Sequence, residues 1–296
     1  MAAASYKNLY NLTLDDEGRL VCDLTKLQIH MVQELNYSQT DAERMVSEIS
    51  KLLITANKAV LHHAAWRRNS ELVKVMLRSV NPSNELTFIQ KQAGGVWGLF
   101  PIVCQRRDLF KLFLESITGD ERCQLLQMRN RYGQTILHFA AAETDAETVG
   151  VILNSVSEVE RYSLLSVRGN DGSTPIHYAS FHVNLGNTKI LATMKSLTSK
   201  EAWYKLIQIP DNREQTLLQV SWWHGHKVAA EIIVASIAAN YFLHFLTTTD
   251  GTGRTPLQQA KDSGDQSVVA LLQDYQTKVL IEVAPQQTYE AGMVYT

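Results

Sequence analysis

The chain has 296 residues, of which 45% are hydrophobic and 20% charged, and its formal net charge at pH 7 is −2. This is the composition of an ordinary globular protein with a large core. A nearly neutral chain lacks the basic surface that binding to nucleic acid by counterion release requires, so we expect no nucleic-acid partner. The three cysteines, Cys22, Cys104 and Cys123, are scattered and odd in number, which indicates a reducing compartment without a disulfide framework.

The sequence shows no targeting or membrane-spanning segment. Residues 1–7 have no basic stretch followed by an apolar region, so no signal peptide is expected. The longest apolar run covers residues 228–246. Three polar residues interrupt this run, Glu231, Asn240 and His244, which favours buried helices over a membrane span. We therefore expect a cytoplasmic protein.

Residues 1–55 are predicted to form two helices, at 24–35 and 41–53. The segment from Ser38 to Asp41 offers caps for the start of the second helix. Its apolar face is formed by Met45, Ile49, Leu52 and Leu53. Two roles fit this part of the chain. It is either a cap that shields the following repeats from water or a small module with a partner of its own.

One motif recurs beyond residue 55. It first reads Ala59-Val-Leu-His-His-Ala-Ala, and later Gly133-Gln-Thr-Ile-Leu-His-Phe-Ala-Ala and Gly172-Ser-Thr-Pro-Ile-His-Tyr-Ala-Ser. Its threonine returns at spacings of 39, 42 and 39 residues, as Thr135, Thr174, Thr216 and Thr255. Ala59 lies 76 residues, or two periods of 38, before Thr135. A fixed period of this length is typical of a stacked-repeat protein.

The motif has a local physical meaning. Gly172 suits the left-handed backbone of a tight turn, Thr174 can cap a helix, and Pro175 then occupies the first helical position. A second helix follows, with an apolar face at i, i+3 and i+4 that Val149, Ile152 and Leu153 form in one copy. Such a unit cannot bury its apolar face alone and must stack on its neighbours.

The copy around residues 90–118 is degenerate. It keeps little of the motif, although the apolar pattern of residues 109–114 restores the second helix. Pro101 falls inside its first helix and should shorten or kink it.

The motif resembles the ankyrin repeat, whose pattern is Gly-x-Thr-Pro-Leu-His-x-Ala-Ala followed by a second helix rich in Val and Leu. The resemblance covers about residues 57–275 in five in-phase copies. Glutamines replace the family's histidine at Gln219 and Gln258, Glu214 replaces the turn glycine, and Lys261 replaces the second alanine. The family is a binding scaffold with diverse partners, so the resemblance predicts the fold more sharply than the chemistry.

The resemblance implies an all-α fold, an ankyrin-repeat α-solenoid of about six repeats with short hairpin fingers. Residues 1–55 would be the helical N-terminal cap or small module, residues 56–275 the array, and residues 276–296 a polar tail.

The repeats exceed the roughly 33 residues usual for the family. The excess is periodic, as in Tyr162-Ser-Leu-Leu-Ser-Val and Tyr204-Lys-Leu-Ile-Gln-Ile, and should add a helical turn and an extended piece before each finger. Long units of this kind resemble ankyrin effectors of intracellular bacteria. The resemblance therefore also implies an effector that acts on a host protein in the host cytoplasm.

The nine histidines do not form a metal-binding pattern. His62, His138 and His177 stand where the family's histidine ties adjacent turns by hydrogen bonds, and we expect that structural role. His224 and His226 are also assigned a structural role. No Cys-x-x-Cys or His-Glu-x-x-His spacing is present, so we predict no metal and no cofactor.

Catalysis is not visible in the sequence. Cys104 precedes Arg106 and Arg107, and is either a thiolate favoured by positive charge or a buried cysteine. No glycine-rich phosphate loop is present. We therefore predict a protein that is not an enzyme and has no small-molecule substrate. The alternative is a scaffold with a second activity, or a separate partner site, in residues 1–55 and the degenerate repeat.

The resemblance also implies where a partner protein would bind. In this family the fingertips and the two residues after the Ala-Ala pair face one concave surface. Carried over position by position, the partner-binding residues are Trp66, Arg67, Arg131, Tyr132, Gln134, Glu143, Asn170, Asp171, Phe181, His182, Arg213, Trp223, His224 and Arg254. Four are large aromatics where the fold needs none, and aromatics beside arginines are typical of binding hot spots. The alternative is that the finger of the next repeat covers each ring.

Overall fold

The computed structural model describes residues 12–14, 20–56, 60–78, 89, 95–117, 119–181, 187–223, 226–237, 239–264, 266 and 268–277. Its contacts divide the chain into two compact units, residues 1–128 and 129–296. The described residues are mainly helical, which confirms the all-α prediction apart from one short hairpin. No helix among them combines the length and the apolar character needed to cross a membrane.

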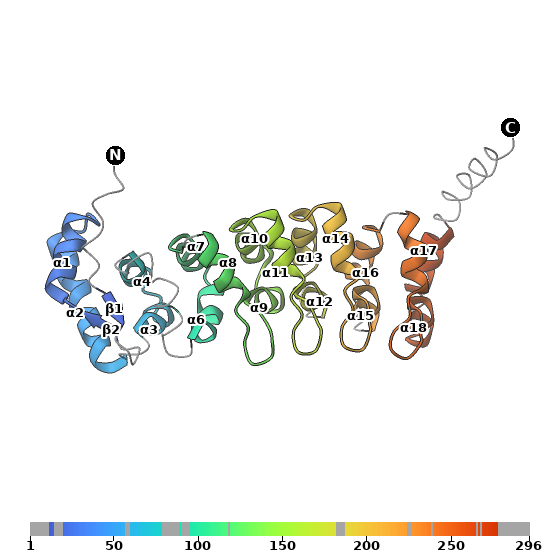
Figure 1. Cartoon of the computed structure of the whole chain (residues 1–296), viewed down its shortest axis with the longest axis horizontal. Helices are drawn as coiled ribbons and strands as arrows, with labels where there is room; N and C mark the ends of the chain where they lie inside the picture. The colour runs from blue at the N-terminus through green and yellow to red at the C-terminus, as the bar shows by residue number, and fades with distance from the viewer. Residues whose placement is uncertain are drawn as a thin grey trace, which may run out of the picture. The chain divides into compact units, whose positions relative to one another are not determined.

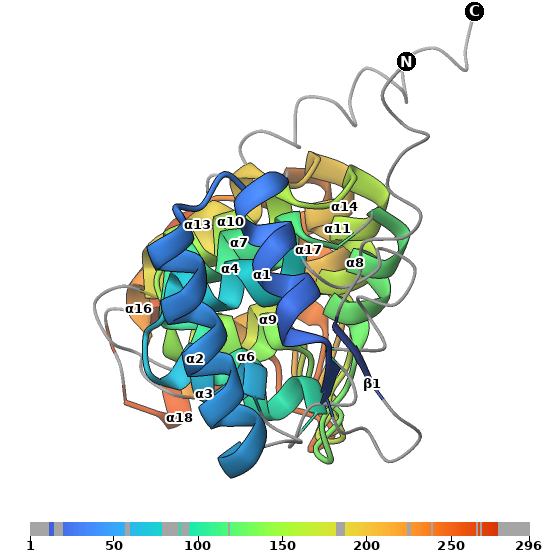
Figure 2. The ribbon, with the colours of Figure 1, turned by 90° about the vertical axis from the view of Figure 1, so that its left-hand side faces the viewer.

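The first unit begins with that hairpin, in which β1 (Leu12–Leu14) pairs antiparallel with β2 (Leu20–Cys22). Two helices follow, α1 (Leu24–Gln33) and α2 (Gln39–Ala56), and they pack side by side (Figure 2). Both helices were predicted, and Ser38 caps the second, since its Oγ accepts from the N–H of Asp41 at 3.1 Å. The hairpin was not predicted, because three-residue strands are too short to show an alternating pattern.

Five more helices complete the description of the first unit: α3 (Val60–Trp66), α4 (Ser70–Arg78), α6 (Gly95–Cys104), α7 (Arg107–Glu115) and α8 (Gly119–Gln127). α3 packs against α2, α4 and α6, and α4 packs against α7. Pro101 was predicted to shorten or kink its helix. The shortening is wrong, since α6 runs through Pro101 for ten residues, and the kink stays a prediction. Tertiary packing holds α6 there, because Phe100 is buried and meets the ring of Phe113 edge-on at 6.0 Å.

The second unit repeats a group of three helices. The groups are α9 (Ile136–Glu143), α10 (Ala146–Asn154) and α11 (Glu158–Leu165); α12 (Pro175–Phe181), α13 (Asn187–Ser196) and α14 (Lys200–Ile207); and α15 (Leu217–Trp223), α16 (Lys227–Val234) and α17 (Ala239–Thr247). α18 (Pro256–Asp262) begins a fourth group. The excess sequence was predicted to add one helical turn to each repeat. It forms a complete third helix of eight or nine residues instead, which is more than two turns.

Equivalent helices of successive groups pack against one another, as Figure 1 shows for α9, α12, α15 and α18. α10, α13 and α16 form a second row, and α11 contacts α14 in a third. Fully buried side chains fill the space between the rows, among them Leu137, Ile152, Ile190, Leu217 and Ile233. Burying each of these aliphatic side chains contributes about 1.5–3 kcal/mol to folding.

Each first helix in the second unit starts at a hydrogen-bonded cap. The N–H of Thr135 donates to Nδ1 of His138 at 3.0 Å, three residues along the chain. The same pair recurs in later groups as Thr174 with His177, Thr216 with Gln219, and Thr255 with Gln258. These caps satisfy backbone donors that a helix start otherwise leaves unpaired.

Candidate functional site

A five-residue turn, which we call a finger, precedes each first helix of the second unit. The fingers are residues 130–134, 169–173, 211–215 and 250–254. In each, the N–H of the first residue donates to the carbonyl of the fifth at 2.8–3.0 Å, and the N–H of the fourth returns to the carbonyl of the first. The fourth residue has a left-handed backbone, with φ of 73° at Gly133, 81° at Gly172, 60° at Glu214 and 78° at Gly253. Glu214 therefore occupies the glycine position, as predicted.

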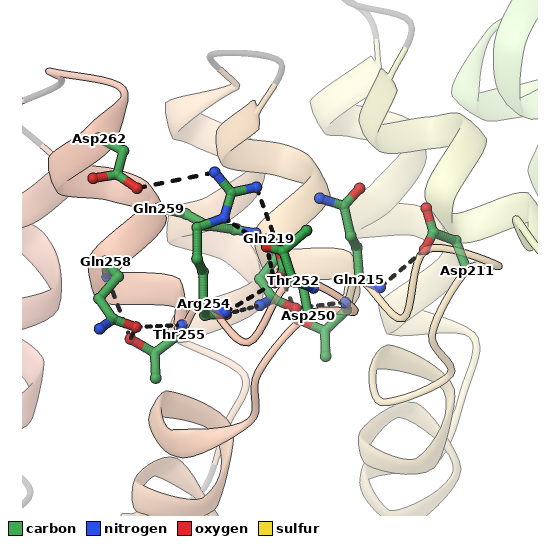
Figure 3. Close-up of polar contacts among 11 residues, drawn as sticks. Asp211, Gln215, Gln219, Asp250, Thr252, Arg254, Thr255, Gln258, Gln259 and Asp262 are labelled. Carbon is green, nitrogen blue, oxygen red and sulfur yellow. Dashed lines mark hydrogen bonds and ion pairs between the residues drawn. The ribbon is translucent and has the colours of Figure 1, made fainter.

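An Asn or Asp side chain fixes three of the four fingers from inside. Oδ1 of Asp250 accepts from the N–H groups of Thr252 and Arg254, both at 2.9 Å (Figure 3). Burial acts to raise the pKa of Asp250, but hydrogen bonds from Thr252 and Arg254 outweigh it and hold the pKa at about 2. Asn130 and Asp211 accept from the corresponding backbone groups of their own fingers.

Hydrogen bonds also join neighbouring fingers into a ladder. The N–H of Asn170 donates to the carbonyl of Tyr132 at 2.9 Å, and that of Asn212 to the carbonyl of Asp171 at 3.0 Å. The N–H of Gly251 continues the ladder to the carbonyl of Arg213 at 3.0 Å. The second unit therefore presents its fingertips on a backbone that is held in register.

The cap histidine ties its helix to the next finger. Nδ1 of His138 accepts from Thr135, so Nε2 carries the proton and donates to the carbonyl of Ser173 at 3.2 Å. Gln219 makes the same link through Nε2 to the carbonyl of Arg254 at 3.1 Å. Burial lowers the pKa of His138 and of His177 to about 4. The structural role predicted for His138 is confirmed.

Two of the predicted partner-binding aromatics are solvent-exposed. Tyr132, at the tip of the first finger, is 53% exposed, and the guanidinium carbon of Arg131 lies 4.7 Å from its ring centroid. Trp66, at the end of α3 in the first unit, is 64% exposed, and Arg67 beside it is exposed too. The alternative that a neighbouring finger covers each ring is wrong for these two.

Other predicted positions are partly engaged within the fold. The amide of Gln134 is held between Asn130 at 2.8 Å and the hydroxyl of Tyr178 at 2.5 Å. Nδ2 of Asn170 donates to the carbonyl of Arg131 at 3.0 Å, and Oδ1 of Asp171 accepts from the N–H of Ser173 at 3.0 Å. The sequence pattern did not reveal these contacts, because two of the partners, Tyr178 and Arg131, belong to a neighbouring repeat.

Arg213 and Arg254 line one shallow cleft of about 520 Å³ between the third and fourth fingers. Arg213 is exposed, whereas Arg254 pairs with Asp250 at 3.3 Å and approaches Asp262 at 3.9 Å (Figure 3). Glu143 is exposed at the end of α9. Four further predicted positions are not placed: the side chains of Phe181 and Trp223, and His182 and His224 as a whole, lie outside the described residues.

The structure favours the buried-cysteine interpretation of Cys104. Its side chain is buried in α6, and burial raises the pKa of the thiol, which is the opposite of what a reactive thiolate needs. Nearby Arg106 donates to the carbonyls of Ala65 and Trp66 at the end of α3. Across the described ranges, no three His, Cys, Asp or Glu side chains come together as a metal site.

Sequence reasoning placed no site on the third helices, yet the structure has a cleft of about 1020 Å³ there. It is lined by residues of α13, α14, α16 and α17, including Trp203, Tyr204 and Tyr241. The signal in the sequence was the recurring segment that begins at Tyr204, which was interpreted only as added length.

The comparisons with known proteins add no identity. No protein-family model matches the chain, and no curated protein matches it.

Proposed function

We propose that this protein is an ankyrin-repeat scaffold, not an enzyme, that binds a partner protein through the finger surface of its second unit. The family assignment is supported by the recurrence of one finger, one Thr-capped first helix and one second helix at a period of 39–42 residues. It is also supported by Gln219 and Gln258, which stand at the family's histidine position. Each accepts from the N–H of the capping threonine, as His138 does.

One observation supports the finger surface above all others. The pair of Arg131 and Tyr132 is exposed, yet it stands on a hydrogen-bonded ladder that fixes its backbone. A large ring held in this way loses little conformational entropy when a partner covers it. Arg213 and the cleft beside Arg254 extend the surface along the same fingers. Trp66 and Arg67 are proposed as a further contact, on the first unit.

We place the interaction in the cytoplasm, of the protein's own cell or of a host cell if the chain is a bacterial effector. For residues 1–55 the cap role is preferred, because α2 packs directly against α3. The buried thiol of Cys104 gives no support to a second activity in the degenerate repeat.

The proposal is tested by capturing partners with the full chain and measuring the affinity of each purified partner for variants. Tyr132→Ala should weaken binding at least about tenfold, since truncating a hot-spot aromatic costs about 2 kcal/mol or more. Tyr132→Phe keeps the ring under Arg131 and should bind nearly as the parent does. Helicity by circular dichroism should not change, because the side chain is exposed.

Lys189→Ala, at an exposed position on α13, serves as the control and should bind like the parent. The finger surface is the wrong assignment if Tyr132→Ala retains parental affinity for every captured partner, and the further contact is wrong too if Trp66→Ala does the same. Residues 1–55 would then be the better candidate.

A further inference from the structure

The cleft on the third helices has an apolar interior. The rings of Tyr204 from α14 and Tyr241 from α17 stack with centroids 4.1 Å apart and planes 30° apart. Trp203 also lines the cleft and is buried, and Ile232 and Ile237 contribute further apolar surface. Tyr241 is nevertheless 45% exposed, so a substantial aromatic surface remains open to solvent.

The polar groups around the cleft are mainly cationic. Lys195, Lys200 and Lys205 line it together with a single carboxylate, that of Glu201. Within the described part of the chain, none of these three ammonium groups forms an ion pair. Three hydroxyls of the cleft are already used, since those of Ser196, Thr198 and Ser236 donate to backbone carbonyls three or four residues earlier in the chain. In a chain of net charge −2, this cleft is a local site of uncompensated positive charge.

The hollow continues onto the neighbouring third helix. A second cleft of about 370 Å³ lies between α11 and α14, and Lys205 lines both. Val159 of α11 borders this second cleft and is 78% exposed, and Tyr162 lines it from the next turn. We call the two clefts together the third-helix groove. It exists because each repeat carries a third helix beyond the roughly 33 residues of an ordinary ankyrin unit.

We propose that the third-helix groove binds an amphipathic α-helix of a partner protein, with acidic residues beside the apolar face of that helix. The apolar face would cover Tyr241, Tyr204 and Val159, and the carboxylates would pair with the three lysines. This site goes beyond the proposed function, since it uses none of the finger residues and can bind a different protein or a second segment of the same one.

The shape of the groove favours a helix over a small molecule. The larger cleft alone reaches the upper end of the about 300–1,000 Å³ range of small-molecule pockets, which enclose most of their ligand. Here most lining residues are exposed or half-buried, so the groove would leave a small ligand in contact with water. The walls of the groove are helices, so no strand edge is available to which a partner could add a strand. A groove between helices typically binds an amphipathic helix instead.

The test uses a displayed library of random peptides of roughly 16 residues, about four helical turns, selected against the full chain. We expect selected peptides with apolar residues at i, i+3 or i+4 and i+7, flanked by Asp or Glu. The affinity of a synthetic copy is then measured by fluorescence anisotropy. Reversing two charges, in the variant Lys200→Glu with Lys205→Glu, should weaken binding at least about tenfold and reduce its salt dependence.

Three variants define the site. Lys189→Glu reverses an exposed lysine of α13 that does not line the groove and should leave affinity unchanged. Tyr132→Ala should also have no effect, which separates this site from the finger surface. Tyr241→Ala should weaken binding. Because the Tyr241 side chain is partly exposed, the variant should keep its fold, and unchanged helicity by circular dichroism would verify this.

Several results would overturn the proposal. These are a selection without enrichment, enriched peptides that lack acidic residues, and affinity that survives both the charge reversal and Tyr241→Ala. Displacement of the peptide by palmitate would instead assign the groove to a lipid. A concentration-dependent dimer that Tyr241→Ala abolishes in sedimentation would assign it to a second copy of this chain.

Discussion

Histidine and glutamine perform the same role at the third residue of the first helices in the second unit. His138 and Gln219 both accept from the N–H of the capping threonine and both donate to a carbonyl of the next finger. The two differ in one respect, because only the imidazole can take up a proton. At the cap position the chain therefore carries two histidines, which can titrate, and two glutamines, which cannot.

This difference predicts a pH dependence of stability. Burial lowers the pKa of His138 and His177 to about 4, from about 6.5 in the unfolded chain. Their contribution to stability should be complete above about pH 6.5 and should fall as the pH drops toward 4. The loss is about 1.4 kcal/mol per pH unit for each histidine, because the unfolded chain binds the proton first. Urea unfolding of the full chain from pH 7 to pH 4.5 measures it.

The matched variant is His138→Gln with His177→Gln, which should keep the caps and flatten this part of the pH profile. His244→Gln, at an exposed position of α17, should leave the profile unchanged. Equal slopes for the parent and the double variant would show that these two histidines do not control the acid response.

At the scale of elements, the finger is the part whose geometry constrains the sequence most. Its fourth residue needs a left-handed backbone, and its neighbour in the next repeat lies close. A Cβ on Gly172 would collide with Oδ1 of Asn212 and come within 2.5 Å of its backbone N, whereas one on Gly253 would meet nothing within 4 Å among the described residues. The same turn is therefore tightly packed in one repeat and open in another.

Substitutions at the fourth finger residue should separate backbone strain from packing. Glu214→Gly should stabilise the fold by up to about 1 kcal/mol, because it relieves a left-handed conformation of a residue with a side chain. Gly253→Ala should destabilise by a similar amount through the backbone alone. Gly172→Ala should cost clearly more, since the finger ladder must shift as well. An equal loss in the free energy of unfolding for the two alanine variants, measured by chemical denaturation, would mean that the ladder can shift at no cost in stability.

The packing of first helices against one another gives a second prediction at this scale. Leu137 of α9 is fully buried, so Leu137→Ala should lower the free energy of unfolding by about 2–5 kcal/mol through the cavity it leaves. Val159→Ala, on the exposed face of α11, should change it by less than about 0.5 kcal/mol. Matching denaturation midpoints for Leu137→Ala and the parent would show that position 137 is not part of the core.

At the scale of the whole molecule, two compact units carry different candidate contacts. The first unit presents Trp66 with Arg67, and the second presents the finger surface and the third-helix groove. Within the second unit these two surfaces belong to different elements: the turns before the first helices form one, and the second and third helices form the other. A repeat with three helices can therefore offer two binding surfaces where a two-helix unit offers one.

Folding of the whole chain is predicted not to depend on a metal. The ring of His138 is occupied at both nitrogens by the cap and the next finger, so it is not available as a ligand. A strong chelator should therefore leave the melting temperature and partner binding unchanged. A drop in melting temperature that added Zn²⁺ reverses would reveal a metal site that the sequence pattern failed to predict.

The sequence by itself determined the period, the caps and the helix pairs. These features depend on contacts between residues three or four apart, such as Thr135 with His138, and on turn residues with a strong backbone preference, such as Gly172. Local chemistry of this kind repeats with the sequence, so it can be predicted wherever the motif is preserved.

Only the tertiary structure decided which predicted binding residues are free to contact a partner. Gln134 and Tyr132 are two residues apart in the same finger, yet one is held by Tyr178 and the other is exposed. The contact of Gln134 joins residues 44 positions apart, across two repeats. The third-helix groove likewise needs side chains of α14, α16 and α17 together. Whether a side chain is exposed or lines a cleft depends on which residues of the next repeat lie beside it. The repeat period alone does not contain that information.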